Sequence, residues 1–351
     1  MRRFVIYAFI AVVALLEHPS ALQSASQAVI TQAPDAPAPQ VRLPLKANSV
    51  RFAVIGDSGT GTKEQYQVGQ QMARYRKQFP FEFVVMLGDN IYGHSKPEDF
   101  KRKFEDPYKA LLDADAKFYA SLGNHDNPNE RFYKPFNMGG KRYYSYKKGN
   151  AAFFSLDSNY MDPEQLSWLE RELSSASSAW KICYFHHPLY SDGEFHGSDL
   201  DLRARLEPVL ERSAVNLVFA GHEHVYERIA AQHGIYHFVL GNSGELRFHN
   251  LRPSPQMMKG FDTDRTFALV EIAGDELFFQ IVSRTGETVD TGMISRQSKQ
   301  SSTGIREWPQ FNLWFETPAL GAESPLQADT VRPWDTVPLH AEPMPVGAQA
   351  S

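Results

Sequence analysis

Five short polar clusters along the chain carry the residue types that bind metal ions. In chain order they are Gly-Asp-Ser-Gly at 56–59, Gly-Asp-Asn-Ile-Tyr at 88–92, Gly-Asn-His-Asp at 123–126, His-His-Pro at 186–188 and Gly-His-Glu-His at 221–224. Carboxylate, phenolate and amide oxygens suit hard cations, and imidazole nitrogen suits iron, zinc or manganese. The mixed set favours a pair of metal ions. Two ions roughly 3.5–4 Å apart can clamp the attacking and leaving oxygens of an in-line displacement.

Each cluster has a simpler explanation when taken alone. An Asp after a strand is more often a turn or helix-cap residue, and a single His is more often a hydrogen-bonded structural residue. The five clusters occur together, however, and each directly follows a short apolar run, so their conjunction favours a shared site. The glycines at 56, 88, 123 and 221 would let the backbone turn sharply and approach that site closely.

The helices that must position these clusters can be predicted from apolar periodicity. Val68, Met72, Tyr75 and Phe79 are spaced as one face of a helix. A second helix is predicted to begin after Asp162, which can cap it before a proline at the first helical position. Helices are also expected over residues 97–112 and 198–212.

Short apolar runs predict the strands, which are expected at residues 50–55, 83–87, 117–121, 143–146, 151–156, 182–185, 217–220, 235–240, 266–272 and 276–283. Strands and helices alternate at first and strands alone follow, so we expect a mixed-sheet α/β or α+β domain. Ligands of open α/β sheets bind beyond the carboxyl ends of strands. The clusters could therefore converge in space, although they span residues 57–224.

The two ends of the chain differ in composition from its body. Residues 1–26 hold two arginines, a 13-residue apolar run and then small residues, which is typical of a secretory signal peptide. The run is short for a membrane span of about 20 residues, so export is expected, with a retained membrane anchor as the alternative.

Residues 27–48 are expected to form a Pro-rich linker, residues 49–296 the catalytic domain, and residues 297–351 a Pro- and Ser-rich extension. An aromatic cluster within that extension is predicted to pack partly on the body.

Composition excludes several classes of protein. The 351 residues include 42% apolar and 22% charged residues, which excludes collagen-like, coiled-coil and wholly disordered chains. The formal net charge of −5 argues against a nucleic-acid partner, because phosphate backbones need a basic surface. The only cysteine, Cys183, cannot form an intramolecular disulfide and is expected in the core. Oligomeric state stays open.

The five clusters together resemble the pattern of the calcineurin-like metallophosphoesterases. Tyr92 follows Asp89 by three residues, and this Gly-Asp-x-x-Tyr spacing is similar to that of the purple acid phosphatases, where the tyrosine binds a ferric ion. The run Gly-His-Glu-His-Val-Tyr-Glu-Arg at 221–228 is similar to the last motif of the plant members. The resemblance covers about residues 50–285 and is closest to the small, single-domain type. It implies a four-layer sandwich of two mixed β-sheets flanked by helices.

The resemblance also implies a ligand set. Asp57, Asp89, Tyr92 and His224 would hold Fe(III), and Asp89, Asn124, His186 and His222 would hold a divalent iron, zinc or manganese ion, with Asp89 as the bridge. His186, rather than His187, fits the family's His-x-Pro. His125 and His196 match the histidines that orient phosphate and protonate the leaving group.

The expected activity is hydrolysis of phosphomonoesters by an exported acid phosphatase. Metal ions lower the pKa of bound water and neutralise phosphoryl oxygens, and a trivalent ion with a phenolate ligand suits an acidic optimum. The expected partner is a small phosphate ester, with no nucleic acid and no membrane after signal cleavage.

Three alternatives stay open. The metal motifs do not set leaving-group specificity, which lies in loops such as 126–142 and 189–200, so a phosphodiesterase or nucleotide hydrolase is possible. A catalytically idle phosphate- or metal-binding protein is the second alternative. If Tyr92 only packs beside the site, the centre would hold two divalent ions. Arg228, Asn242, Glu245 and Arg247 are expected either to line the mouth of the site or to be solvated.

Overall fold

A computed structural model of the chain describes residues 38–296 and 305–306. The expected signal segment, the first half of the linker and nearly all of the C-terminal extension, including its aromatic cluster, lie outside the described residues. Within the ranges that the structure describes, no helix is long and apolar enough to span a bilayer.

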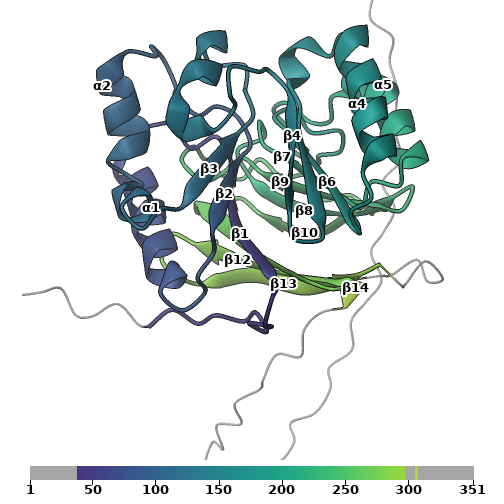
Figure 1. The fold of residues 1–351 in the computed structure, drawn as a ribbon. Helices are drawn as coiled ribbons and strands as arrows, with labels where there is room; N and C mark the ends of the chain where they lie inside the picture. The colour runs from purple at the N-terminus through teal and green to yellow at the C-terminus, as the bar shows by residue number, and fades with distance from the viewer. Residues whose placement is uncertain (1–37, 297–304, 307–351) are drawn as a thin grey trace, which may run out of the picture. The chain divides into compact units, whose positions relative to one another are not determined.

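The first sheet contains three parallel strands followed by an antiparallel half (Figure 1). Its order is β14 (Ile305–Arg306), β13 (Thr288–Ser295), β12 (Glu276–Ser283), β11 (Thr266–Ala273), β1 (Val50–Ile55), β2 (Phe83–Met86) and β3 (Lys117–Ala120). Strands β1, β2 and β3 are parallel, and β11 pairs antiparallel with β1. The carboxyl ends of three strands therefore lie side by side at one edge.

The second sheet is also mixed. Its order is β10 (Met257–Phe261), β8 (Tyr226–Gln232), β9 (Ile235–Leu240), β7 (Leu217–Ala220), β6 (Trp180–Phe185), β5 (Ala151–Ser155) and β4 (Tyr144–Lys148). Strands β5, β6, β7 and β9 are parallel in turn, and the outer strands pair antiparallel.

Strand β1 shows how two-residue periodicity builds four layers. Phe52 and Val54 pack between the sheets, against residues such as Phe153 of the second sheet. Ala53 and Ile55 point to the opposite face of the first sheet and join a separate core. That outer face is covered by α1 (Lys63–Arg76), α2 (Pro97–Phe100), the π-helical stretch η1 (Lys101–Glu105) and α3 (Lys109–Leu112). The outer face of the second sheet packs against α4 (Pro163–Ser175) and α5 (Leu200–Arg212). The fold is thus the predicted four-layer sandwich of two mixed sheets flanked by helices.

Most predicted elements lie within a residue or two of their expected bounds, and some local signals are confirmed in detail. The Asp162 carboxylate accepts a hydrogen bond from the Gln165 backbone N–H at 2.8 Å, as an N-cap should. Cys183 is fully buried in β6, as expected of a core residue. Helix α1 ends at Arg76, and Phe79 is buried just beyond it.

Two sequence predictions about elements are wrong. The single helix expected over residues 97–112 is broken into α2, η1 and α3, because Pro107 lacks an N–H and its ring opposes a continuous helix. Strands β8, β10, β13 and the two-residue β14 were not expected. In β8, the buried charged residues Glu227 and Arg228 interrupt the apolar alternation that would have marked a strand.

Candidate metal centre

The five polar clusters lie together beyond the carboxyl ends of parallel strands. Strands β1, β2 and β3 lead to the first three clusters, and β6 and β7 of the second sheet lead to the last two. All seven side chains predicted as metal ligands contact at least one other member of the set. The expected convergence of these clusters is therefore seen in the structure.

One group of donor atoms surrounds Tyr92. Its hydroxyl lies 3.4 Å from Asp57 Oδ1 and 3.2 Å from His224 Nε2. His224 Nε2 lies 3.4 Å from the same Asp57 oxygen. These three atoms form a triangle of one carboxylate oxygen, one phenol oxygen and one imidazole nitrogen.

A second group of donor atoms surrounds His186. Its Nε2 lies 2.9 Å from Asn124 Oδ1, 3.1 Å from His222 Nδ1 and 3.4 Å from Asp89 Oδ1. The Asp89 carboxylate also interacts with the Tyr92 hydroxyl of the first group. Asp89 therefore lies between the two groups and contacts a member of each.

The donor set fits a cation because its lone pairs face each other. His186 Nδ1 lies 2.9 Å from the carbonyl oxygen of Leu87, which can only accept, so this ring nitrogen carries the proton. In the neutral ring, Nε2 then presents a lone pair to the amide oxygen of Asn124 at 2.9 Å. Two acceptors at this distance repel each other, and a positive ion held between them would remove that repulsion. The surrounding residues therefore fit a bound metal.

The burial of Asp57 and Asp89 also indicates that a cation fits between them. Asp57 is 0% exposed and Asp89 is 1% exposed. Burial, and then the neighbouring Asp89, raises the pKa of Asp57 well above its usual value, and burial also raises the pKa of Asp89. A cation between two buried carboxylates would favour their charged forms.

Three other predicted ligands are held in their neutral forms. Burial and the surrounding imidazoles lower the pKa of both His186 and His222, so the rings stay neutral and able to coordinate. Burial and the two carboxylates raise the pKa of the Tyr92 phenol. Ionising that phenol therefore requires a strongly charged cation in contact with it.

The backbone at the site adopts rare conformations, and glycines let the strand-end loops approach the buried carboxylates closely. Asp57, Asp89 and His222 have φ values of 51°, 51° and 69°, in a region that non-glycine residues rarely occupy. A Cβ on Gly123 would lie 2.2 Å from Asp89 Oδ1, and one on Gly221 would lie 2.4 Å from Asp57 Oδ2. Only glycine allows the two strand-end loops to pass so close to the carboxylates.

Two buried carboxylates that support the site were not assigned any role from the sequence. Asp126 accepts hydrogen bonds from the backbone N–H groups of Asn90, Ile91 and Gly123 and from the Asn90 side chain, at 2.7–3.0 Å. It thereby joins the loops that carry Asp89 and Asn124. Glu223 accepts hydrogen bonds from the backbone N–H groups of His196 and Gly197 and from Asn250. Both carboxylates lie inside the recognised clusters, and that position was the only signal in the sequence.

The two histidines predicted to act on the substrate lie at the exposed side of the centre. His125 is exposed, and its ring centroid lies 5.0 Å from that of Tyr92. His196 is also exposed, and its ring lies 3.9 Å from that of His222. His187, which was not predicted as a ligand, belongs to a cluster with His186 and His222 whose nitrogens lie within 4.8 Å of one another.

Among the four loop residues expected at the mouth or in solvent, only two lie near the ligands. Arg247 packs its guanidinium on Phe195, 3.4 Å from the ring centroid, and its Nη2 lies 3.4 Å from His196 Nε2. Glu245 raises the pKa of Asp57 by its charge.

The other two residues serve the fold instead. Arg228 forms a buried ion pair with Asp290 at 2.8 Å. Asn242 is fully buried and accepts a hydrogen bond from the Thr266 hydroxyl at 2.7 Å. Neither is solvated, which corrects the sequence expectation for both.

Comparisons with known proteins agree with this geometry. The profile of the calcineurin-like phosphoesterase family matches residues 50–226, just over half of the chain, and this stretch includes all five clusters. The chain is 28% identical over 288 residues to purple acid phosphatase 4 of Arabidopsis thaliana, covering 70% of this chain and 84% of that protein. It is 23% identical over 302 residues to tartrate-resistant acid phosphatase type 5 of Homo sapiens, covering 72% of this chain and 92% of that protein.

Solved structures show the same fold. GAP50, described as the anchor in the inner membrane complex of Plasmodium, matches with a TM-score of 0.62 at 23% identity, over 72% of this chain and 90% of that one. The purple acid phosphatase PPD1 from yellow lupin matches with a TM-score of 0.59 at 18% identity, over 71% of this chain and 54% of that one. With its strand-end clusters, its two mixed sheets and its buried Asp/His centre, the chain belongs to the calcineurin-like phosphoesterase family.

Proposed function

We propose that this protein is an exported acid phosphatase of the purple type that hydrolyses phosphomonoesters. The observation that carries the proposal is the pair of donor groups on either side of Asp89, one of which contains the Tyr92 hydroxyl. A centre with two divalent ions needs no phenol among its ligands, whereas Fe(III) binds phenolate oxygen well.

The proposed ligands are those that the family resemblance implied. Asp57, Tyr92 and His224 would hold Fe(III), and Asn124, His186 and His222 would hold a divalent ion, with Asp89 shared. Bound there, the two cations would supply a water of lowered pKa and neutralise charge on the phosphoryl oxygens. The hydrogen bond from His186 to Leu87 orients that ring before any ion binds.

The residues around the centre can position the phosphoryl group. Arg247 has no carboxylate partner among the described residues, and its stack on Phe195 holds the guanidinium beside His196. We assign to Arg247 the binding of a phosphoryl oxygen, since planar guanidinium groups match phosphate geometry. His125 and His196 are exposed beside Tyr92 and His222, respectively, and would orient the phosphate and protonate the leaving group.

Two other activities are compatible with the same fold. A phosphodiesterase or nucleotide hydrolase would use the same donor set and differ in its loops. A binding role without catalysis is a further possibility, because a protein of this fold is described as an anchor. The complete donor set around Asp89 favours catalysis over binding alone. Export is proposed on the composition of residues 1–26.

One experiment separates these possibilities. Hydrolysis of p-nitrophenyl phosphate and of bis(p-nitrophenyl) phosphate is measured from about pH 4 to 9, with metal content and visible spectrum recorded on the same sample. Acid-side monoester turnover with a purple iron–phenolate band supports the proposal. Faster diester turnover would favour the phosphodiesterase, and a fully metallated sample that turns over neither ester would favour the binding role.

A further inference from the structure

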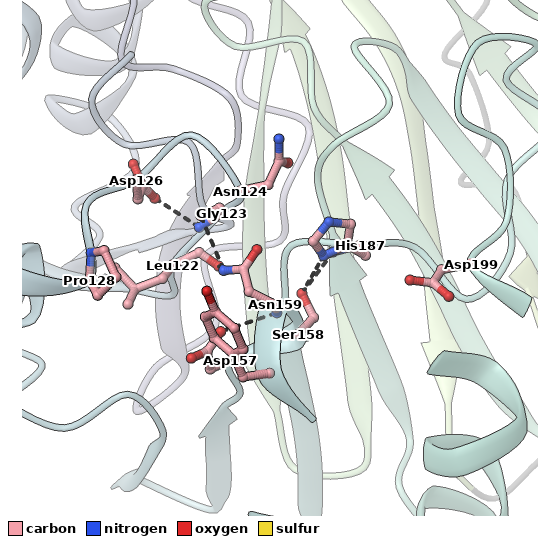
Figure 2. A pocket seen from close by; sticks show the side chains of 11 residues that line it. Leu122, Gly123, Asn124, Asp126, Pro128, Asp157, Ser158, Asn159, His187 and Asp199 are labelled. Carbon is pink, nitrogen blue, oxygen red and sulfur yellow. Dashed lines mark hydrogen bonds between the residues drawn. The ribbon is translucent and has the colours of Figure 1, made fainter. Parts of the chain in front are cut away.

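A pocket of about 570 Å³ opens directly beside the proposed metal centre (Figure 2). Asn124, a proposed ligand, and His187, a neighbour of His186 and His222, belong to its wall. The other lining residues are Leu122, Gly123, Asp126, Pro128, Asp157, Ser158, Asn159, Tyr160 and Asp199. A phosphate ester bound at the centre has this space available for its alcohol portion.

The wall of this pocket contains three carboxylates and no lysine or arginine. The Asp126 oxygens are occupied by N–H donors, as described above. Asp157 is neutralised by Arg142, whose Nη1 lies 3.1 Å from Asp157 Oδ2. Asp199 Oδ1 caps helix α5 by accepting the Leu202 N–H at 2.9 Å. Its Oδ2 has no hydrogen bond or ion pair with any described residue, so Asp199 contributes a negative charge that the N-terminus of α5 offsets only in part.

The amide and hydroxyl groups of the wall are oriented so that acceptors remain available. The Asn159 Nδ2 donates to the carbonyl oxygens of Leu122 and Gly123 at 3.3 and 3.1 Å, which leaves its Oδ1 without a partner among the described residues. The Ser158 hydroxyl is engaged by His187 through both the backbone N–H and Nδ1 of that residue. Figure 2 shows Asn159 and Asp199 on either side of Ser158 and His187.

We propose that this pocket receives the leaving-group alcohol, and that it selects alcohols that carry hydroxyl or ammonium groups and no negative charge. The inference rests on the proposed phosphatase function. Hydroxyl and ammonium groups can donate hydrogen bonds to Asp199 Oδ2 and Asn159 Oδ1. A carboxylate or second phosphate would face the Asp199 charge with no cation in the wall to offset it.

Three phosphomonoesters of nearly equal size test this selection. They are 2-aminoethyl phosphate, 2-hydroxyethyl phosphate and carboxymethyl phosphate, whose leaving groups are cationic, neutral and anionic. The chemical reactivity of the three esters differs, so the readout is how their kcat/KM ratios change when the pocket charge is removed.

Asp199→Asn removes that charge with little effect on the helix, because Asn and Asp are comparable N-caps. We expect the ratio of kcat/KM for carboxymethyl phosphate to that for 2-aminoethyl phosphate to rise about three- to tenfold. Asp201→Asn is the matched control, since Asp201 is exposed on the same helix and does not line the pocket. It should leave the ratio unchanged. Asp199→Ser, another good N-cap, repeats the test if the Asn variant does not fold.

The outcomes are distinguishable. If no ester, including p-nitrophenyl phosphate, is hydrolysed by the metallated wild type, the proposed function fails. If p-nitrophenyl phosphate is hydrolysed but the Asp199 variants shift the ratio no more than Asp201→Asn does, the pocket inference is overturned. A shift confined to the 2-aminoethyl ester assigns the pocket to ammonium groups, and an equal loss with the 2-hydroxyethyl ester assigns it to hydroxyl groups.

Discussion

Asp57 and Asp89 occupy equivalent places beyond neighbouring parallel strands, and each has a φ of 51°. The loops that carry them are joined, since the Asp57 N–H donates to the carbonyl oxygen of Gly88 at 3.1 Å and the Gly59 N–H donates to that of Asp89 at 3.1 Å. Two buried carboxylates are thus held close together by the backbone, at a cost in strain and repulsion that a bound cation would offset.

Asp89→Asn should abolish turnover and stabilise the metal-free protein. Asn tolerates a positive φ and can still accept the His125 N–H that Asp89 Oδ1 accepts at 3.0 Å. Removing one of two repelling buried charges should raise the apo unfolding free energy by about 1 kcal/mol. Urea unfolding of apo protein, metal content and p-nitrophenyl phosphate turnover measure the three effects. Asp275→Asn, at an exposed ion pair with Arg296, is the control. Unchanged turnover in Asp89→Asn would contradict the proposed bridging role of Asp89.

Tyr92→Phe should remove the visible absorption band while two metal ions stay bound. The band requires a phenolate on Fe(III), and the Tyr92 hydroxyl is the phenol placed between Asp57 and His224. Tyr133→Phe, at a hydroxyl bonded to Glu105 instead, should keep the band. Absorption spectroscopy with metal analysis decides the matter. A colourless, active wild type containing two divalent ions would rule out the ferric assignment.

Asp126→Asn should destabilise the fold and lower activity together. The carboxylate accepts four N–H donors, and in Asn the amide nitrogen would replace the oxygen that accepts from Gly123 and the Asn90 side chain. Loss of two charge-assisted hydrogen bonds at a buried site should cost about 2–4 kcal/mol. Urea titration measures this cost, with Asp113→Asn, at an exposed ion pair with Lys109, expected within about 0.5 kcal/mol of wild type. Equal stability of the two variants would contradict the supporting role.

Arg247→Gln should weaken phosphate binding more than it lowers kcat. A guanidinium–phosphate hydrogen bond that is lost from a half-buried site should raise the inhibition constant of inorganic phosphate about tenfold. Arg252→Gln is a suitable control, because Arg252 is exposed and pairs with Glu194. If the two variants bind phosphate equally well, Arg247 does not contact the phosphoryl group.

Glu227→Gln should remove part of the pH dependence of the unfolding free energy. Burial raises the pKa of Glu227 from 4.5 to about 7 in the folded protein. Between pH 4.5 and about pH 7, Glu227 is therefore protonated in the folded state and ionised in the unfolded state. Stability therefore falls as the pH rises through about 4.5 to 7, by about 3 kcal/mol in total.

The Gln side chain resembles the protonated acid and cannot ionise. Urea unfolding of wild type and Glu227→Gln at pH 5 and pH 7.5 should therefore show a difference in unfolding free energy that grows with pH in favour of the variant. Both proteins share the metal centre, so its own pH dependence cancels. Glu98→Gln, at an exposed position, should follow wild type. A constant difference across the pH range would show that Glu227 does not titrate in this window.

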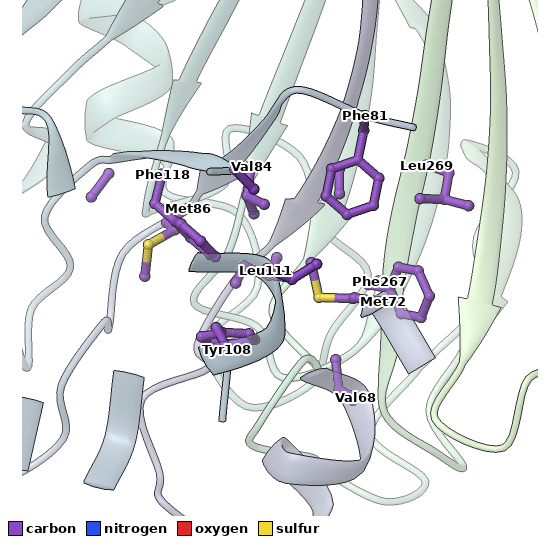
Figure 3. Packing of buried hydrophobic residues seen from close by; sticks show 14 of the residues in the cluster. Val68, Met72, Phe81, Val84, Met86, Tyr108, Leu111, Phe118, Phe267 and Leu269 are labelled. Carbon is purple, nitrogen blue, oxygen red and sulfur yellow. The ribbon is translucent and has the colours of Figure 1, made fainter. Parts of the chain in front are cut away.

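Local patterns in the sequence predicted much of the fold because they depend on neighbouring residues alone. Val68 and Met72 were expected on one helix face, and both are buried in the core that α1 forms with the first sheet (Figure 3). The strands that lead to the five clusters were each predicted within two residues of their bounds, because their apolar runs end in glycine- or histidine-led polar segments.

Contacts between residues that are far apart in the sequence could not be predicted from such local patterns. Strand β8 contains Glu227 and Arg228, which resemble surface residues until Ser191 and Asp290 are seen to satisfy them from 36 and 62 positions away. Strand β13 holds Asp290 and was missed for the same reason. A charged residue can be buried only with a partner, and the partner's identity depends on which strands become neighbours.

The sequence by itself determined the residue types of the five polar clusters, their order and their placement after strands, because residue chemistry and apolar periodicity are local properties. Only the tertiary structure decided that Asp126 and Glu223 support the loops of the site, that Arg247 rests on Phe195, and that the pocket beside Asn124 has no cation in its wall. These facts depend on distances between segments that are far apart in the chain. Such distances are set by the packing of two sheets against each other, which no local pattern encodes.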